Sequence, residues 1–412
     1  MKYKIGEITE SCLGKMLDTQ KNKGEYHPYL ANINVRWGSF DLENLSLMRF
    51  EQNENERYGI KNGDLIMCEG GEPGRCAIWR DEIPNMKIQK ALHRIRPNIE
   101  FVDVEYLYYW FLLSSKNDLL RRFFTETTIK HLPGKILKQL VIDLPEMTTQ
   151  KNISSTLRLL DNKILINNKI NDNLQHQLNT LYDYWFTQYD FPDENGKPYR
   201  SSGGKMIWND TLKINIPINW EVQSVISNSL SSVIMPGIDY FKNKTYLATA
   251  DVKGTSISTG VVIDYEGRES RANMQPTINS VWFAKMKNSI KHLYLNKEML
   301  PIISNSILST GFCGLQCEEI SFEYIASYIS NSYFEFHKDI VSHGATQEAV
   351  NNDDLESIYI AIPENNVLKS YHNTSRPIYA QISKNICENQ KLMKLRDWLL
   401  PMLMNGQATV SN

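Results

Sequence analysis

The sequence predicts an α+β protein built from two copies of one unit, each a globular mixed α/β domain followed by a long helix. Two observations lead to this prediction. The segment from Thr128 to Pro145 is repeated from Thr346 to Pro363, at a constant offset of 218 residues. Each copy is followed by apolar residues three and four positions apart, the spacing of a coiled-coil helix. We expect an antiparallel pair of coiled-coil helices to separate the two domains, as an internal pseudo-twofold repeat.

The repeat also gives the expected boundaries. Leu140 falls on Ile358 and Ile142 on Ile360, in an alternation typical of a half-buried strand that a proline ends. Upstream of about residues 100 and 320 the two sequences diverge, so we expect a shared frame with different leading portions. The expected parts are a first domain at 1–147, a first helix at 148–187, a linker at 188–212, a second domain at 213–365, and a second helix with a C-terminal tail at 366–412.

The first helix is expected to begin at Thr148 or Thr149, because either hydroxyl can cap it. About 38 residues at 1.5 Å each make a rod of roughly 57 Å, long enough to hold two domains at a fixed distance. In the second helix, Pro377 removes a backbone donor and Ser375 could cap a new start. The second helix is therefore expected to kink or to begin near Pro377.

Four asparagines lie in the two apolar seams, and the offset relates them in pairs. If the helices pack antiparallel, Asn167 faces Asn389 and Asn171 faces Asn385, with leucine and isoleucine layers on both sides. One layer is unfavourable, because it sets the charged Arg396 against the apolar Leu160. Buried asparagine pairs cost stability but fix the register, because a slip would leave amides against leucine. The alternative is that each asparagine lies on a solvated flank.

Composition excludes several classes of protein. The 412 residues contain no run of about 18 apolar residues, and the N-terminus lacks the apolar segment of a secretory signal. We therefore expect a cytoplasmic protein. The six cysteines show no zinc spacing, so no metal site is expected, and they are interpreted as reduced thiols. The net charge of −2 is unusual for a protein that binds nucleic acid, and local basic clusters can equally be a solvated surface.

No catalytic motif was found. The sequence has no Walker loop, no His-Glu-x-x-His and no Asn/Asp-Pro-Pro-Tyr methyltransferase motif, and its histidines form no recognisable catalytic set. We expect no catalytic residues and no cofactor. Leu65–Trp79 reads as a strand, a glycine turn and a strand, with Arg75 after the last glycine. The turn could cradle a phosphate, but a tight hairpin turn is favoured.

Two segments resemble a known family. Tyr184–Lys205 resembles the junction, and Leu395–Gln407 the C-terminal signature, of specificity subunits of type I restriction-modification enzymes. The resemblance covers essentially the whole chain, in the order recognition domain, helix, recognition domain, helix. One departure is Ser270–Pro276, which opens part of the second domain and is unlike the first domain.

The resemblance implies a non-catalytic subunit that recognises a bipartite site in double-stranded DNA. Each domain would read one half, and the helices would set the spacer between the halves. The helices would also dock two DNA methyltransferase subunits, and the complex would recruit restriction subunits with endonuclease and translocase activity. Two alternatives remain at this point: a stand-alone two-domain DNA-binding regulator without enzyme partners, and an enzyme with a degenerate motif.

Candidate DNA contacts follow from chemistry, because phosphates need Lys and Arg while bases need Arg, Asn, Gln, Ser or Thr at loop tips. In the first domain the candidates are Arg75, Thr128, Lys130 and His131. In the second domain they are Arg271, Asn273, Lys285, Lys287, Thr346 and Gln347. The alternative is that these side chains are merely solvated.

Overall fold

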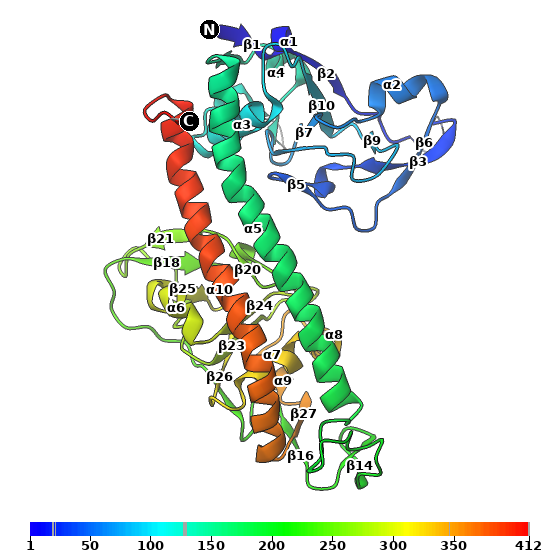
Figure 1. Cartoon of the computed structure of the whole chain (residues 1–412), viewed down its shortest axis with the longest axis vertical. Coiled ribbons are helices and arrows are strands. Elements are labelled where there is room, and N and C mark those ends of the chain that lie inside the picture. Colours follow the sequence, from blue (N-terminus) through cyan, green and yellow to red (C-terminus); the bar gives the residue numbers. More distant parts are fainter. Residues whose placement is uncertain (19, 21, 127–129, 346, 411–412) are drawn as a thin grey trace. The chain divides into compact units, whose positions relative to one another are not determined.

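The computed structural model describes the chain except residues 19, 21, 127–129, 346 and 411–412 (Figure 1). The chain forms two compact units. Unit 1 comprises Met1–Asp161 with Leu395–Asn412, and unit 2 comprises Asn162–Lys394. The chain therefore passes between units inside two long helices, α5 (Met147–Tyr182) and α10 (Asn365–Met404). Among the described residues no helix has the length and apolar character needed to span a membrane.

Unit 1 is built on a four-stranded antiparallel sheet in the order β2-β10-β7-β8. Its strands are β2 (Thr9–Leu13), β10 (Leu92–Pro97), β7 (Leu65–Cys68) and β8 (Cys76–Ile78). Helix α3 (Val104–Lys116) contacts β8 and supplies buried aromatic side chains to the core. Two further groups of strands lie around the sheet. In one, β1 (Lys2–Lys4) pairs with β13 (Val141–Asp143), and in the other, β3 (Glu25–Leu30) pairs with β6 (Leu47–Phe50) and β9 (Lys87–Ile88). The remaining elements are the hairpin β4–β5 (Val35–Arg36 and Ser39–Phe40) and the short helices α1 (Ile5–Ile8), α2 (Asn55–Tyr58) and α4 (Gly134–Leu137).

Unit 2 has a sheet of the same order, β17-β26-β23-β24. Its strands are β17 (Ser231–Val233), β26 (Phe312–Cys317), β23 (Ser280–Ala284) and β24 (His292–Leu295). Helix α7 (Phe322–Ser330) packs on β23 and β24. A second sheet has the order β21 (Val261–Ile263), β18 (Lys244–Leu247), β25 (Ser306–Ser309) and β22 (Ala272–Met274), and β16 (Glu221–Ser224) pairs with β27 (Tyr359–Ile362). The remaining elements are the hairpin β19–β20 (Val252–Lys253 and Ser256–Ile257) and the helices α6 (Leu300–Asn305), α8 (Ser332–Val341) and α9 (Asn352–Leu355).

The two domains share most of their elements in the same order, and part of this match extends into the leading portions, where the two sequences diverge. Helices α3 and α7 begin 218 residues apart, and so do α4 and α9, β13 and β27, and α5 and α10. The leading portions also match, since β18 pairs antiparallel with β21 and parallel with β25, as β3 does with β6 and β9. Strands pair through backbone groups, which every residue type except proline provides in full. Two sequences can therefore diverge while their strand pairing stays the same, and the match is not visible in the residues.

The predicted α+β class, with two mixed domains and two long helices, is confirmed. The domains differ in a few additions. Unit 2 adds α8 and β22. The short hairpin β11–β12 of unit 1 (Thr125–Glu126 and Lys130–His131) corresponds to the antiparallel bridge between His343 and Ala349 in unit 2. A further hairpin, β14–β15 (Met206–Asn209 and Ile214–Pro217), spans the expected boundary at residue 213. We therefore propose that the linker ends before Met206.

Helix α10 is continuous through Pro377, so a new start near that residue is wrong. The helix begins at Asn365, and the Ser375 hydroxyl donates to the Tyr371 carbonyl (2.7 Å) instead of capping a helix start. Proline removes one backbone hydrogen bond, but Tyr371 and Tyr379 on either side are buried in the core of unit 2. Their burial holds the helix where local propensity alone would end it. Thr148 and Thr149 likewise lie inside α5, which begins at Met147.

Candidate nucleic-acid interface

The glycine turn of the first domain is fixed between two neighbouring segments. The backbone N–H of Glu69 donates to the Ala91 carbonyl (2.9 Å), and the N–H of Leu132 donates to the Glu69 carbonyl (2.8 Å). Gly70 pairs with His131, and a Cβ on Gly70 would lie 2.8 Å from the His131 ring, so only glycine fits without a shift. Because β7 and β8 pair antiparallel on either side of this turn, the favoured interpretation of a hairpin turn is confirmed.

Arg75 is held inside the first domain. Its guanidinium donates to the Asn32 carbonyl (3.1 Å) and side-chain oxygen (2.9 Å), and pairs with Glu72 (2.7 Å). Its side chain is 18% exposed. Glu72 also accepts a hydrogen bond from the Trp37 indole (3.0 Å). Arg75 therefore shapes the turn, and a contact between its guanidinium and DNA would require these bonds to be exchanged.

The other first-domain candidates lie beside this turn. Lys130 is exposed and His131 is half-buried, both on β12, which the Gly70–His131 bridge joins to the glycine turn. Thr128 lies outside the described residues. The structure thus brings Arg75, Lys130 and His131 to one loop cluster, although the sequence separates Arg75 from the other two by more than fifty positions.

The second-domain candidates gather at the corresponding place. The N–H of Lys285 donates to the Gly311 carbonyl (2.9 Å), and the N–H of Val350 donates to the Lys285 carbonyl (3.0 Å). Lys287 pairs with Glu348 (2.7 Å), next to the exposed Gln347. Thr346 lies outside the described residues. Loop 285–291 and the segment before α9 therefore form one surface.

Arg271 joins this surface through the turn at residues 310–311, and Asn273 follows two positions later on β22. The Arg271 carbonyl accepts from the Thr310 N–H (2.9 Å), while its side chain is exposed. Asn273 lies on β22, half-buried, and its carbonyl accepts from the Gly237 N–H (2.9 Å). Arg271, Lys285, Lys287 and Gln347 thus lie around the loop that joins β23 to β24, whereas Asn273 lies on the neighbouring strand β22.

The loop clusters of the two domains are equivalent. The bonds that close them match: Glu69 corresponds to Lys285, Ala91 to Gly311 and Leu132 to Val350. A cation also recurs directly before the second strand of each hairpin. Lys291 donates to the Thr249 carbonyl (2.5 Å), as Arg75 donates to the Asn32 carbonyl. Sequence reasoning missed the roles of Lys291 and Asn32, which only the alignment of the two hairpins could have revealed.

A buried ionic triad anchors the loop of the second domain. Lys338, fully buried on α8, donates to Glu335 (2.6 Å) and to the carbonyls of Ala284 and Ser289 (both 3.3 Å). Glu335 also bonds His292 (2.7 Å). Burial works to raise the pKa of Glu335, but the bond to His292 and the Lys338 charge outweigh it and lower that pKa. Lys338 thereby ties both ends of the loop to α8.

The four seam asparagines pair across the two helices within unit 2, where α5 and α10 lie side by side (Figure 1). Asn167 donates to Asn389 (2.9 Å), and Asn385 donates to Asn171 (2.8 Å). All four side chains are buried rather than on a solvated flank. The two bonds are related by the 218-residue offset, because Asn167 corresponds to Asn385 and Asn389 to Asn171.

Replacing Asn389 with leucine is expected to destabilise the helix pair by about 1–3 kcal/mol, because Asn167 then loses its buried acceptor. The double variant N167L/N389L is expected to regain most of this loss, since no amide then faces leucine. Urea denaturation of the full chain measures both. Asn373→Leu, at an exposed position of α10, is the matched control. A double variant less stable than either single variant would contradict the pairing.

The layer that sets Arg396 against Leu160 is stabilised within unit 1, because the Arg396 guanidinium forms ion pairs. Its guanidinium donates to Asp161 (2.8 Å) and Asp397 (2.9 Å) and is 18% exposed. Burial works to lower the pKa of Arg396, but the two carboxylates outweigh it and raise that pKa. Asp161 also accepts from the Tyr109 hydroxyl (2.6 Å), so the layer joins both helices to α3.

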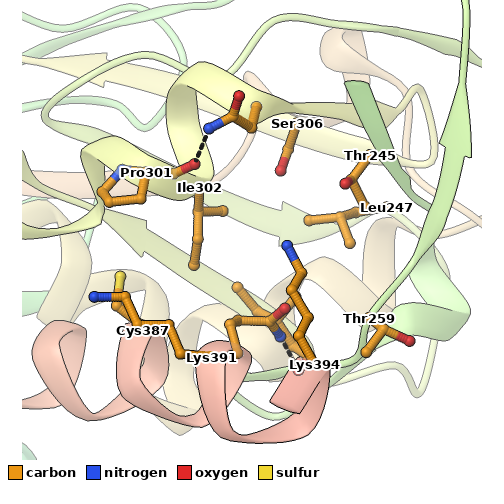
Figure 2. A pocket seen from close by; sticks show the side chains of 12 residues that line it. Thr245, Leu247, Thr259, Pro301, Ile302, Ser306, Cys387, Lys391 and Lys394 are labelled. Carbon is orange, nitrogen blue, oxygen red and sulfur yellow. Dashed lines mark hydrogen bonds between the residues drawn. The ribbon is translucent and has the colours of Figure 1, made fainter. Parts of the chain in front are cut away.

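A hollow in unit 2 marks where α10 packs on the second domain. Figure 2 shows Cys387, Lys391 and Lys394 of α10 facing Pro301 and Ile302 of α6. Gln390 donates from α10 to the carbonyls of Ile257 (2.6 Å) and Ser258 (3.0 Å), and the Cys387 thiol bonds the Glu298 carbonyl (3.5 Å). These bonds fix the direction of α10 relative to its own domain.

No group of histidine, cysteine or carboxylate side chains with metal-binding geometry occurs among the described residues. The cysteines are free, and burial raises the pKa of Cys313 to about 12. A raised pKa keeps the thiol protonated and poorly nucleophilic near neutral pH.

The chain matches one family model and is similar to several known proteins. Residues 1–176 match the family model described as type I restriction modification DNA specificity domain. The chain is similar to the type I restriction enzyme MjaIX specificity subunit of Methanocaldococcus jannaschii, with 25% identity over 362 residues that cover 84% of this chain and 78% of that protein. The HindI specificity subunit of Haemophilus influenzae is 21% identical over 409 residues, which cover 85% and 88%. The crystal structure of a type I restriction-modification S subunit from M. genitalium aligns over 98% of this chain and 95% of its own, at 14% identity and a TM-score of 0.48.

Proposed function

We propose that this chain, which belongs to the family of type I restriction-modification specificity subunits, reads a bipartite site in double-stranded DNA without catalysing a reaction itself. The observation that carries the proposal is the duplicated frame with unlike loops. Glu69, Gly70 and Arg75 in one loop stand where Lys285, Met286 and Lys291 stand in the other. Loops that differ in charge and size on one frame suit two different half-sites.

The helix pair supports a further part of the proposal, a fixed spacer between the half-sites. Gln390 ties α10 to its domain, and the asparagine pairs fix how α5 and α10 slide past each other. A pair of helices locked in register acts as a rigid connection, because each layer of side chains resists displacement along the axis. We propose that this connection sets the number of unspecified base pairs.

We further propose that the helices dock two DNA methyltransferase subunits and that the assembly recruits restriction subunits. Helix α5 carries apolar side chains exposed to solvent within unit 2, namely Leu165 (49%), Ile166 (52%) and Ile170 (41%). Apolar residues grouped on a helix exterior are typical of protein interfaces. The near-neutral net charge also suits a reader whose partners add positive surface around the DNA.

Sequencing the methylated bases of a genome in cells that carry this chain and its partner subunits tests the proposal directly. The expected result is methylated adenine in both halves of one split motif, and loss of that methylation when the chain is deleted. Co-purification is expected to give two methyltransferase chains per copy. Methylation that survives deletion, or full activity of the chain without partners, would favour a stand-alone regulator instead.

A further inference from the structure

A hollow of about 520 Å³ opens in unit 1 beside the first-domain loop cluster. Three cationic side chains border it: Arg57 on α2, and Lys135 and Lys138 at α4. All three are exposed, and the residues that line the hollow include no carboxylate. Glu10 on β2 precedes the lining residue Ser11 and is paired with the buried Arg94 (2.6 Å). A positive surface of this kind attracts an anion.

The floor of the hollow links it to the loop that holds the candidate base contacts. His93 on β10 lines the hollow, is 1% exposed, and bonds the Leu132 carbonyl (3.0 Å). Leu132 follows His131 directly and closes the glycine turn through Glu69. Burial lowers the pKa of His93, so the ring is neutral near pH 7 and the charge comes from the three cations. Any anion bound here lies next to the first-domain loop cluster.

The equivalent positions of the second domain carry the opposite charge. Because α4 and α9 begin 218 residues apart, Lys135 corresponds to Asp353 and Lys138 to Glu356. Both carboxylates are exposed, as the lysines are. The segment that carries Arg57, α2, comes between β6 and β7, where unit 2 has β22 instead. The duplicated frame therefore offers a cationic site in one copy and an anionic surface in the other.

We propose that this hollow binds a phosphate of the DNA backbone next to the half-site read by the first domain, and that the second domain lacks this contact. The inference rests on the proposed function. Phosphate contacts from Lys and Arg fix a protein's position on the duplex, whereas base contacts select sequence. Three cations around one hollow, whose floor residue His93 bonds the first-domain loop cluster at Leu132, suit such a positioning contact. The first domain then contributes more of the salt-dependent binding than the second.

The test exchanges the charges between the copies. The variant K135D/K138E, in the complex with its methyltransferase subunits, is expected to bind a duplex carrying the methylated motif about 10–100 times more weakly near 0.1 M salt. The slope of log K against log salt is expected to become shallower by about 0.9, the change for one lost phosphate contact. Arg57→Gln is expected to act in the same direction. The reciprocal variant D353K/E356K is the matched control and is expected not to weaken binding.

The possible outcomes distinguish a failure of the phosphate site from a failure of the proposed DNA-reading function. Unchanged affinity and salt slope for K135D/K138E, while the wild-type complex still selects its motif, would overturn the phosphate site alone. A change in the preferred bases would also overturn it, because a backbone contact weakens all sequences alike. A wild-type complex that does not distinguish its motif from a scrambled duplex would overturn the proposed function and this inference with it. All four exchanged side chains are exposed, so folding is expected to be retained.

Discussion

Replacing Lys338 with methionine is expected to destabilise unit 2 by about 3–5 kcal/mol, the range for removing one partner of a buried ion pair. The variant leaves Glu335 charged and buried with only His292 as a partner, and it leaves the carbonyls of Ala284 and Ser289 without their donor. Hydrogen exchange of the full chain measures the loss where it occurs, since amides of β23 and β24 are expected to lose protection first.

Two further variants show whether the charge or the packing is responsible. Lys297→Met changes an exposed lysine of unit 2 and is expected to alter stability by no more than about 0.5 kcal/mol. The double variant E335Q/K338M is expected to be more stable than K338M, because the unpaired carboxylate is gone. If K338M loses less than about 1 kcal/mol, the triad does not hold the loop.

Lys338 also links stability to DNA recognition. Its contacts lie at both ends of the loop that carries Lys285 and Lys287. We therefore expect K338M, at a temperature where it remains folded, to relax the half of the motif that the second domain reads. The half read by the first domain is expected to stay unchanged, because Lys338 belongs to unit 2.

Inserting seven residues into both helices is expected to lengthen the spacer of the DNA motif by about three base pairs. The insertions go after Asp161 in α5 and after Lys394 in α10, where the chain passes between the units. Seven residues restore the heptad seam, and at 1.5 Å per residue they add about 10 Å. Each base pair of the duplex advances roughly 3.4 Å. Sequencing of methylated bases is expected to show the same two half-sites further apart.

Two control variants carry the seven-residue insertion at a single place, either in α5 alone or outside both helices. Insertion into α5 alone makes the two helical connections between the units unequal in length. The asparagine pairs of unit 2 and the Asp161–Arg396 pair of unit 1 then cannot both keep their register, and methylation is expected to fall strongly. Insertion at the exposed turn Asp193–Gly196, between the helix and the second domain, is expected to leave the spacer unchanged. A spacer that keeps its length with both helices extended would show that the helices do not set it.

The sequence predicted those parts of the fold that repeat locally. The 218-residue offset, the apolar seams and the facing of Asn167 with Asn389 are visible in the residues alone, because helix periodicity places each side chain on a known face. The partners in an antiparallel pair then follow from counting. The ion pair between Arg396 and Asp161 could have been found in the same way, because Asp161 directly follows the seam residue Leu160.

Other features depend on contacts between distant segments. Arg75 was expected to reach outward, but Asn32 binds it because β4, β5 and β7 fold against each other. The triad of Lys338, Glu335 and His292 joins a helix to a strand more than forty positions away. The second helix was expected to kink or to begin near Pro377, yet α10 begins at Asn365 and continues through the proline, because core packing outweighs one lost hydrogen bond. The candidate DNA contacts stay a prediction. Which of their side chains are exposed depends on how the loops fold, and the sequence alone does not show this.

The way the two loop clusters are closed has a consequence for how this protein can evolve. The bonds at Glu69 and Leu132, and those at Lys285 and Val350, join backbone to backbone. Mutations that change the side chains there leave these bonds in place, so the loops can drift while the scaffold persists. A change in one loop cluster then leaves the other undisturbed, so the DNA target can change one half at a time.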